Sequence, residues 1–125
     1  MSEHPKGELA IQTLAMPADT NANGDIFGGW LVSQMDLAGA VMAKQTSAGR
    51  VVTVAINSMV FYEPVQVGDL VSCYTELTKI GKTSMTINVQ AWRSRNVSGE
   101  RTKVTEGSFV YVAVDPQGRP RPVKS

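Results

Sequence analysis

The chain has 125 residues, the size of one domain, and 42% of them are hydrophobic, enough to build a core. The formal net charge is only +1 and no cluster of lysine and arginine forms a basic patch, so we expect no nucleic-acid partner. The polar start, MSEHPKGE, indicates no signal peptide, and no stretch reads as a membrane span. The single cysteine, Cys73, excludes an internal disulfide framework and fits a reducing cytosol, so we expect a cytoplasmic protein.

The first element is predicted to be a strand over residues 8–14, after a loose tail at residues 1–7. The loop of residues 18–27 follows this strand and carries the strong turn signal Asn23-Gly24-Asp25. This loop leads into the longest apolar segment of the chain.

A helix is predicted to follow Gly28-Gly29 and to end at Gly49, since glycine commonly ends helices. Apolar residues recur at helical spacing and also occupy the other faces: Leu31, Met35, Ala38 and Met42 on one face, and Trp30, Val32, Leu37, Val41 and Ala43 elsewhere. A helix that is apolar on nearly every face is buried, and at about 16 residues this one is too short for a bilayer, which needs ~20. We therefore expect a central helix wrapped by the rest of the protein.

Four strands are expected after the helix, because the hydrophobic period changes to two. They are predicted at residues 52–62, 70–80, 83–91 and 103–114, with turns at residues 81–82 and 96–99. On the first of these strands, one face is expected to carry Val52, Val54, Ile56, Val60 and Tyr62. Cys73 is expected inside the second, where it behaves as a small hydrophobic residue. The proline-rich, basic residues 116–125 are expected to form a loose tail.

The order of one strand, one buried helix and four strands predicts an α+β fold in a single domain over residues 1–125. Strands joined by short turns pair antiparallel, which gives an antiparallel sheet with the helix on one face. One helix cannot cover a sheet of this length completely. The simplest cover for the remaining apolar surface is a second copy of the chain.

Asp36 is the only carboxylate within the apolar helix. Its neighbours on the same helical face are all apolar or small: Val32, Ser33, Gly39, Ala40 and Ala43. An ionised carboxylate in such surroundings is costly unless it is paired or lines a cavity. Either Asp36 caps a group or meets a basic side chain at the helix edge, or it acts beside a pocket as a base or nucleophile.

The remaining residues exclude most other catalytic chemistries. The only histidine, His4, lies in the tail, badly placed for a Ser-His or Cys-His pair, and no Cys/His cluster has metal-binding spacing. The segment GDIFGG lacks the lysine of a phosphate-binding loop and does not match the dinucleotide fingerprint.

The start of the helix offers polarising backbone groups instead. The N–H groups of Gly28, Gly29 and Trp30 lack partners within the helix and lie at the positive end of its dipole, where a carbonyl oxygen could bind. Tight packing of the two glycines against the sheet is an equally good interpretation. Together with one carboxylate, such a site suits acyl transfer to water.

The segment LAMPADTNANGDIFGGWLVSQMDLAGAVMAK closely resembles the hotdog-fold acyl-CoA thioesterases, specifically the bacterial YciA type. The similarity continues through GRVVTVAINSMVFYEPVQVGDLV, the hairpin GKTS and the ending FVYVAVD, so it covers roughly residues 9–115. The resemblance implies a five-stranded antiparallel sheet wrapped around a central helix, the hotdog fold. It also implies hydrolysis of acyl-CoA to free CoA and a carboxylic acid. Coenzyme A is then part of the substrate and product, and no further cofactor or metal is expected.

The resemblance also implies roles for single residues. Asp36 corresponds to the catalytic carboxylate, and Asn21 to a catalytic asparagine in the loop before the helix, with Asn23 as a substitute. The amides of Gly28 and Gly29 would polarise the thioester carbonyl. The residues expected to bind the phosphates of CoA are Arg50, Lys82, Thr83 and Ser84, for which solvated turn residues are the alternative.

Two other functions compete with thioester hydrolysis. A hotdog dehydratase or hydratase would need a histidine beside its carboxylate, and a non-catalytic acyl-CoA-binding module would have no use for Asp36. The sequence leaves open whether Asp36 activates water or attacks directly to give an anhydride. It also leaves open the acyl chain, since Met35, Met42 and Met59 suit either an adaptable pocket or the core.

The resemblance implies paired subunits, commonly three pairs in a hexamer. Fifteen residues, expected to be mostly helical, separate Asn21 from Asp36, which gives up to ~20 Å at 1.5 Å per residue. One small thioester group would not reach both residues within a single chain. We therefore expect each active site to be shared between two subunits related by two-fold symmetry.

Overall fold

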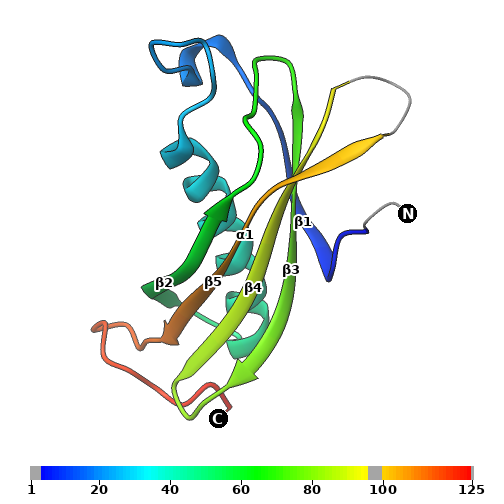
Figure 1. The fold of residues 1–125 in the computed structure, drawn as a ribbon. Coiled ribbons are helices and arrows are strands. Elements are labelled where there is room, and N and C mark those ends of the chain that lie inside the picture. Colours follow the sequence, from blue (N-terminus) through cyan, green and yellow to red (C-terminus); the bar gives the residue numbers. More distant parts are fainter. Residues whose placement is uncertain (1–3, 96–99, 125) are drawn as a thin grey trace.

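The computed structural model describes residues 4–95 and 100–124, so the turn predicted at residues 96–99 lies outside the described residues. Figure 1 shows β1 (Glu8–Leu14), a 3-10 turn (Pro17–Asp19), α1 (Gly28–Ser47), β2 (Val51–Phe61), β3 (Leu70–Ile80), β4 (Ser84–Ser94) and β5 (Arg101–Ala113). The strands β1 and β3 have the bounds that the sequence predicted.

All five strands pair antiparallel in one sheet of order β1-β3-β4-β5-β2. The helix α1 lies along one face of this curved sheet, as Figure 1 shows. It connects β1 to β2, which form the two opposite edges. The predicted α+β hotdog fold is confirmed.

The hydrophobic core lies between α1 and the inner face of the sheet. Met35 and Ala38 of α1 are fully buried in one cluster with alternate residues of β4 and β5, among them Ile87 and Phe109. Cys73 of β3 is also fully buried, as predicted, and burial raises the pKa of its thiol to about 12. The thiolate form that reacts with thiol reagents is therefore scarce in the folded protein.

The sheet covers the inner face of α1, but the prediction that this helix is buried is wrong for its outer face in the single chain. The helix is longer than expected, and Leu37 and Val41 on the face away from the sheet are 55% and 40% exposed. A single sheet can bury only one side of a helix, so the apolar pattern on the outer face exceeds what one chain uses. No helix among the described residues is long and apolar enough to cross a membrane.

The apolar row predicted for β2 is exposed in the single chain. Its members Val52, Val54, Ile56 and Val60 all have exposed side chains, whereas Thr53 reaches back to α1. The register with β5 shifts twice along β2, and Ser58 has a positive φ of 56° between the paired residues. Because β2 is an edge strand, its free edge and this apolar row form an uncovered surface of the single chain.

The C-terminal residues 116–124 are mostly exposed but make several hydrogen bonds to the rest of the chain, so the predicted loose tail is wrong there. The Arg121 guanidinium donates to the carbonyl oxygen of Ser47 at the end of α1 (3.1 Å) and to that of Val114 (3.0 Å). A cation at this end of a helix complements its dipole. Val123 is buried, and a Cβ on Gly49 would lie only 2.5 Å from the Arg121 guanidinium, so a larger residue there would push the end of this side chain aside.

Candidate active site

The carboxylate of Asp36 is held by two hydroxyl groups from the sheet. Thr53 of β2 donates to Oδ1 over 2.7 Å, and the Tyr111 hydroxyl of β5 lies 3.0 Å from Oδ1 and 2.7 Å from the main-chain oxygen of Asp36. Thr53 and Tyr111 are direct cross-strand partners, so their hydroxyls converge from adjacent strands. One carboxylate oxygen is thereby fixed against the sheet.

The second oxygen of Asp36, Oδ2, accepts no hydrogen bond from any residue within 4–95 and 100–124. No basic side chain of these residues forms an ion pair with Asp36 either, so the interpretation as an edge ion pair is wrong for the single chain. Asp36 is half-buried. The arrangement leaves one oxygen of a partly desolvated carboxylate free to act as a base or nucleophile.

The sequence analysis missed Thr53, Tyr111 and Gly39 as parts of this cluster. Gly39 lies in the middle of α1, where a Cβ would stand 2.2 Å from the Tyr111 hydroxyl, so its lack of a side chain admits the tyrosine. A glycine inside a helix costs about 1 kcal/mol relative to alanine and is a signal that could have been followed. Burial, then the charge of Asp36, raises the pKa of Tyr111, which keeps its hydroxyl protonated as a donor.

A second polar feature lies at the start of α1. The N–H of Trp30 donates to the Phe27 oxygen over 3.1 Å, so the prediction that this amide is free is wrong. By contrast, no described residue accepts from the N–H of Gly28 or Gly29. A Cβ on Gly28 would make only an ordinary 3.6 Å contact with Phe61, and one on Gly29 would meet nothing within 4 Å. Packing within one chain therefore does not explain the two glycines, and the interpretation as tight packing loses its support.

Asn21 lines an open cavity of about 370 Å³ beside this helix start, together with Gly28 and Phe61. Its Oδ1 accepts from the N–H groups of Asn23 (2.9 Å) and Asp25 (3.2 Å), which fixes the loop. The Asn21 Nδ2 group has no acceptor among the described residues, so its remaining capacity is that of a donor. Asn23 is exposed and does not line this cavity.

Within one chain, Asp36 and the cavity at the helix start are separate. Asp36 does not line that cavity and lies eight residues after Gly28, a rise of about 12 Å along the helix axis. The residues between Asn21 and Gly28 form a loop rather than helix, so the helical rise accounts for about 12 Å of the separation of up to ~20 Å that was predicted.

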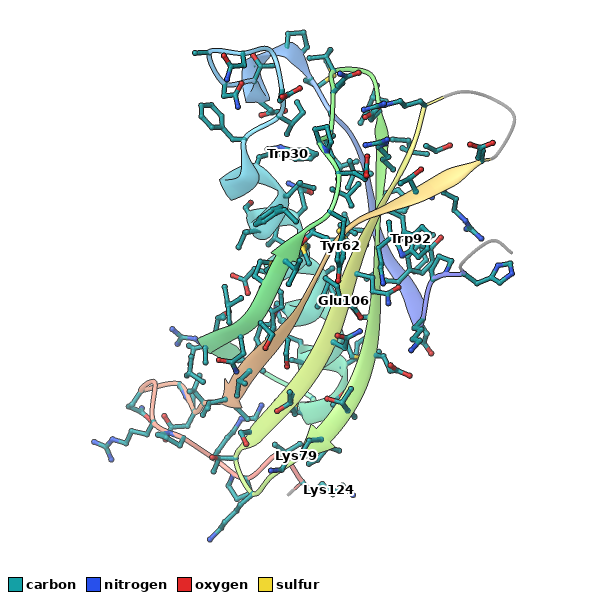
Figure 2. All side chains as sticks on the ribbon, viewed as in Figure 1. Trp30, Tyr62, Lys79, Trp92, Glu106 and Lys124 are labelled. Carbon is teal, nitrogen blue, oxygen red and sulfur yellow. The ribbon has the colours of Figure 1, made fainter. Side chains whose placement is uncertain are left out.

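The four residues predicted to bind CoA phosphates gather at the other end of the molecule. The Arg50 and Thr83 oxygens accept from the N–H groups of Val114 and Ala113, and the Lys82 oxygen accepts from Val123, while Ser84 begins β4. Figure 2 shows Lys79 and Lys124 at this end and Trp30 at the opposite one. Several cations thus surround the C-terminal end of α1.

The described residues contain no group of three or more His, Cys, Asp and Glu side chains that could hold a metal ion. Of the three methionines proposed for a pocket, Met35 is fully buried, and Met42 and Met59 are partly buried against the core. These methionines belong to the core of the single chain.

Comparison with known proteins agrees with a fold of the thioesterase class. The family model "Thioesterase superfamily" matches residues 23–100. The acyl-CoA thioester hydrolase YciA of Salmonella typhimurium is 57% identical over 126 residues, covering 98% of this chain and 95% of that protein. The chain belongs to the thioesterase superfamily, and within it to the YciA family of acyl-CoA thioester hydrolases.

Two solved structures extend the similarity to three dimensions. A hexameric thioesterase from Yersinia pestis is 57% identical with a TM-score of 0.92, covering 98% of this chain and 99% of that one. A hexameric broad-specificity acyl-coenzyme A thioesterase, crystallised as an aspartate-to-alanine variant, is 52% identical with a TM-score of 0.91, covering 94% and 87%. The resemblance inferred from the sequence is therefore confirmed.

Proposed function

We propose that the protein hydrolyses acyl-CoA thioesters to free CoA and a carboxylic acid. The activity that names its relatives supports this proposal, and so does the chemistry of the residues. The observation that carries it is the Asp36 carboxylate, the only one of α1, with Oδ1 held by hydroxyl groups and Oδ2 free.

In the proposed reaction, Oδ2 of Asp36 acts on the thioester carbon in one of two ways. As a general base it takes a proton from water while the water oxygen forms a bond to the carbonyl carbon. As a nucleophile it forms an anhydride, which water then hydrolyses. In both routes the carbon–sulfur bond breaks, and the departing CoA thiolate takes up a proton.

The developing negative charge on the carbonyl oxygen needs hydrogen-bond donors. The free N–H groups of Gly28 and Gly29 at the positive end of the helix dipole supply them in this proposal. The Asn21 Nδ2 group, which lines the same cavity, is a further donor for the carbonyl oxygen or the attacking water.

The active site is proposed to form between two subunits. Within one chain, Asp36 lies outside the cavity that holds Asn21 and Gly28, so neither cluster alone has both a carboxylate and free donors. The exposed β2 edge and its apolar row suit pairing with a second copy about a two-fold axis. Three such pairs would give a hexamer, the assembly named for related enzymes.

The basic end of the molecule is the proposed site for the phosphates of CoA. Arg50 and Lys82 have exposed side chains there, and the Ser84 and Thr83 hydroxyls lie in the same turn region. Phosphate groups bind to such cations and hydroxyls through charge-assisted hydrogen bonds.

Release of free thiol from butyryl-CoA, followed with a thiol reagent, tests the proposal. The buried Cys73 stays unreactive, so the signal reports the product. Wild type should turn over, and Asp36→Asn should fold normally but lose ~10²–10⁴-fold in rate. The matched control Glu76→Gln, an exposed carboxylate on β3, should keep wild-type rates. Turnover in Asp36→Asn equal to that of the control would refute the role of Asp36.

A further inference from the structure

Tyr111 is the one side chain that contacts both the main-chain oxygen and the side-chain Oδ1 of Asp36 among the described residues. Its ring is fully buried, and it is stacked on Phe109 with 6.4 Å between ring centroids. It projects from β5, which is paired on both sides by β4 and β2. The hydroxyl is therefore a fixed point against which the carboxylate can be aligned.

We propose that Tyr111 is a positioning residue for catalysis: its hydroxyl, admitted by Gly39, holds Oδ1 of Asp36 and so presents Oδ2 as the reacting oxygen. This inference rests on the proposed hydrolase function and deepens it. Thr53 alone could not fix the carboxylate equally well, because it donates to Oδ1 only, whereas Tyr111 also contacts the main-chain oxygen of Asp36.

Two contacts from one hydroxyl restrict Asp36 more than a single hydrogen bond would. The 2.7 Å contact fixes the tyrosine to the helix backbone, and the 3.0 Å contact selects the rotation of the carboxylate about its own side-chain bond. Catalytic groups must be aligned closely, since a misplacement of about 1 Å can cost ~10²-fold in rate. The contact of Tyr111 is therefore expected to affect turnover rather than substrate affinity.

The conservative variant Tyr111→Phe removes only the hydroxyl and keeps the buried ring. With butyryl-CoA as the probe, we expect kcat to fall ~10- to 100-fold while KM changes by less than about twofold. The matched control is Tyr74→Phe, whose hydroxyl accepts from Arg101 over 3.1 Å and makes no contact with Asp36. This control should keep the wild-type kcat.

A double-mutant cycle separates positioning from a structural role. If Tyr111 acts through Asp36, adding Tyr111→Phe to Asp36→Asn should lower the residual rate by less than about twofold. An equal loss of rate in both backgrounds, or an unchanged kcat in Tyr111→Phe alone, would overturn the inference. Full activity of Asp36→Asn would instead refute the proposed function, whatever Tyr111→Phe does.

A second variant keeps the test decisive should Tyr111→Phe fail to fold. Gly39→Ala places a methyl group 2.2 Å from the present position of the hydroxyl, so it displaces the hydroxyl without deleting it. The same loss of kcat and the same cycle with Asp36→Asn are expected for a folded Gly39→Ala protein. Wild-type kcat in that protein would overturn the inference.

Discussion

Replacing Gly39 with alanine should destabilise the protein, although alanine is the better helix former. The added Cβ would lie 2.2 Å from the Tyr111 hydroxyl and 2.9 Å from two of its ring carbons, well inside a normal contact of ~3.5–4.0 Å between carbon atoms. Tyr111 must therefore move by about 1 Å, and it is fully buried beside Phe109 with no free space to enter.

The size of the effect follows from two opposing contributions. Overfilling a packed core costs about 1–3 kcal/mol, and the change from glycine to alanine inside a helix returns about 1 kcal/mol. We expect a net loss of up to about 2 kcal/mol in the free energy of unfolding. Adding Tyr111→Phe removes the closest contact but leaves the two at 2.9 Å, so the double variant should regain part of this loss.

Urea unfolding at one fixed protein concentration measures this effect, because the midpoint of an oligomer depends on concentration. Gly29→Ala is the control, since a Cβ there meets nothing within 4 Å, and it should be at least as stable as wild type. If Gly39→Ala unfolds at the same urea concentration as Gly29→Ala, the close packing of Tyr111 on α1 is wrong.

Three further predictions follow from other parts of the chain. Gly28→Val and Gly29→Val should lower kcat about 10-fold or more by blocking access to the two amides, with little change in the unfolding midpoint. Normal turnover in both variants would show that these amides do not take part in catalysis. Arg121→Ala should lower Tm by about 5 °C through loss of its hydrogen bonds to Ser47 and Val114, whereas exposed Arg119→Ala should not. Equal Tm values would mean that these hydrogen bonds of Arg121 contribute no stability. Burial raises the pKa of Glu106, but hydrogen bonds from Gln90, Asn88 and Lys103 and the charge of Lys103 outweigh it and lower the pKa overall. Glu106 therefore stabilises the fold at pH values above its unfolded pKa of about 4.3. Denaturation at several pH values should show Glu106→Gln less stable than wild type at pH 7, and this difference in stability should shrink as the pH falls below ~4. A difference that does not depend on pH would contradict this prediction.

The fold could be predicted from the sequence because local signals agreed with one another. Glycine and proline turns bound β1 and β3, and the change of hydrophobic period separates the helix from the strands. Asp36 stood out for the same reason, as a lone carboxylate in an apolar helix. Such signals depend on neighbouring residues only, and these remain neighbours in the fold.

The rest of the site depends on contacts between distant residues. Thr53 and Tyr111 meet Asp36 across 17 and 75 positions of sequence, and only the register between β2 and β5 brings their hydroxyls together. Arg121 likewise reaches Ser47 across 74 positions, from a segment whose composition is typical of disorder. An alternating pattern such as that of β2 also cannot indicate whether its apolar face is buried by the same chain or left for a partner.

The most direct test of the shared active site is complementation between two inactive variants. Asn21→Ala and Asp36→Asn should each be nearly inactive as homodimers. Refolded together, they form mixed dimers in which one site carries both substitutions and the other carries neither. Random pairing makes half the dimers mixed, each with one of its two sites intact, so activity should recover to roughly a quarter of wild type. Verified mixed dimers that show no recovery would contradict a site built from Asn21 of one subunit and Asp36 of the other.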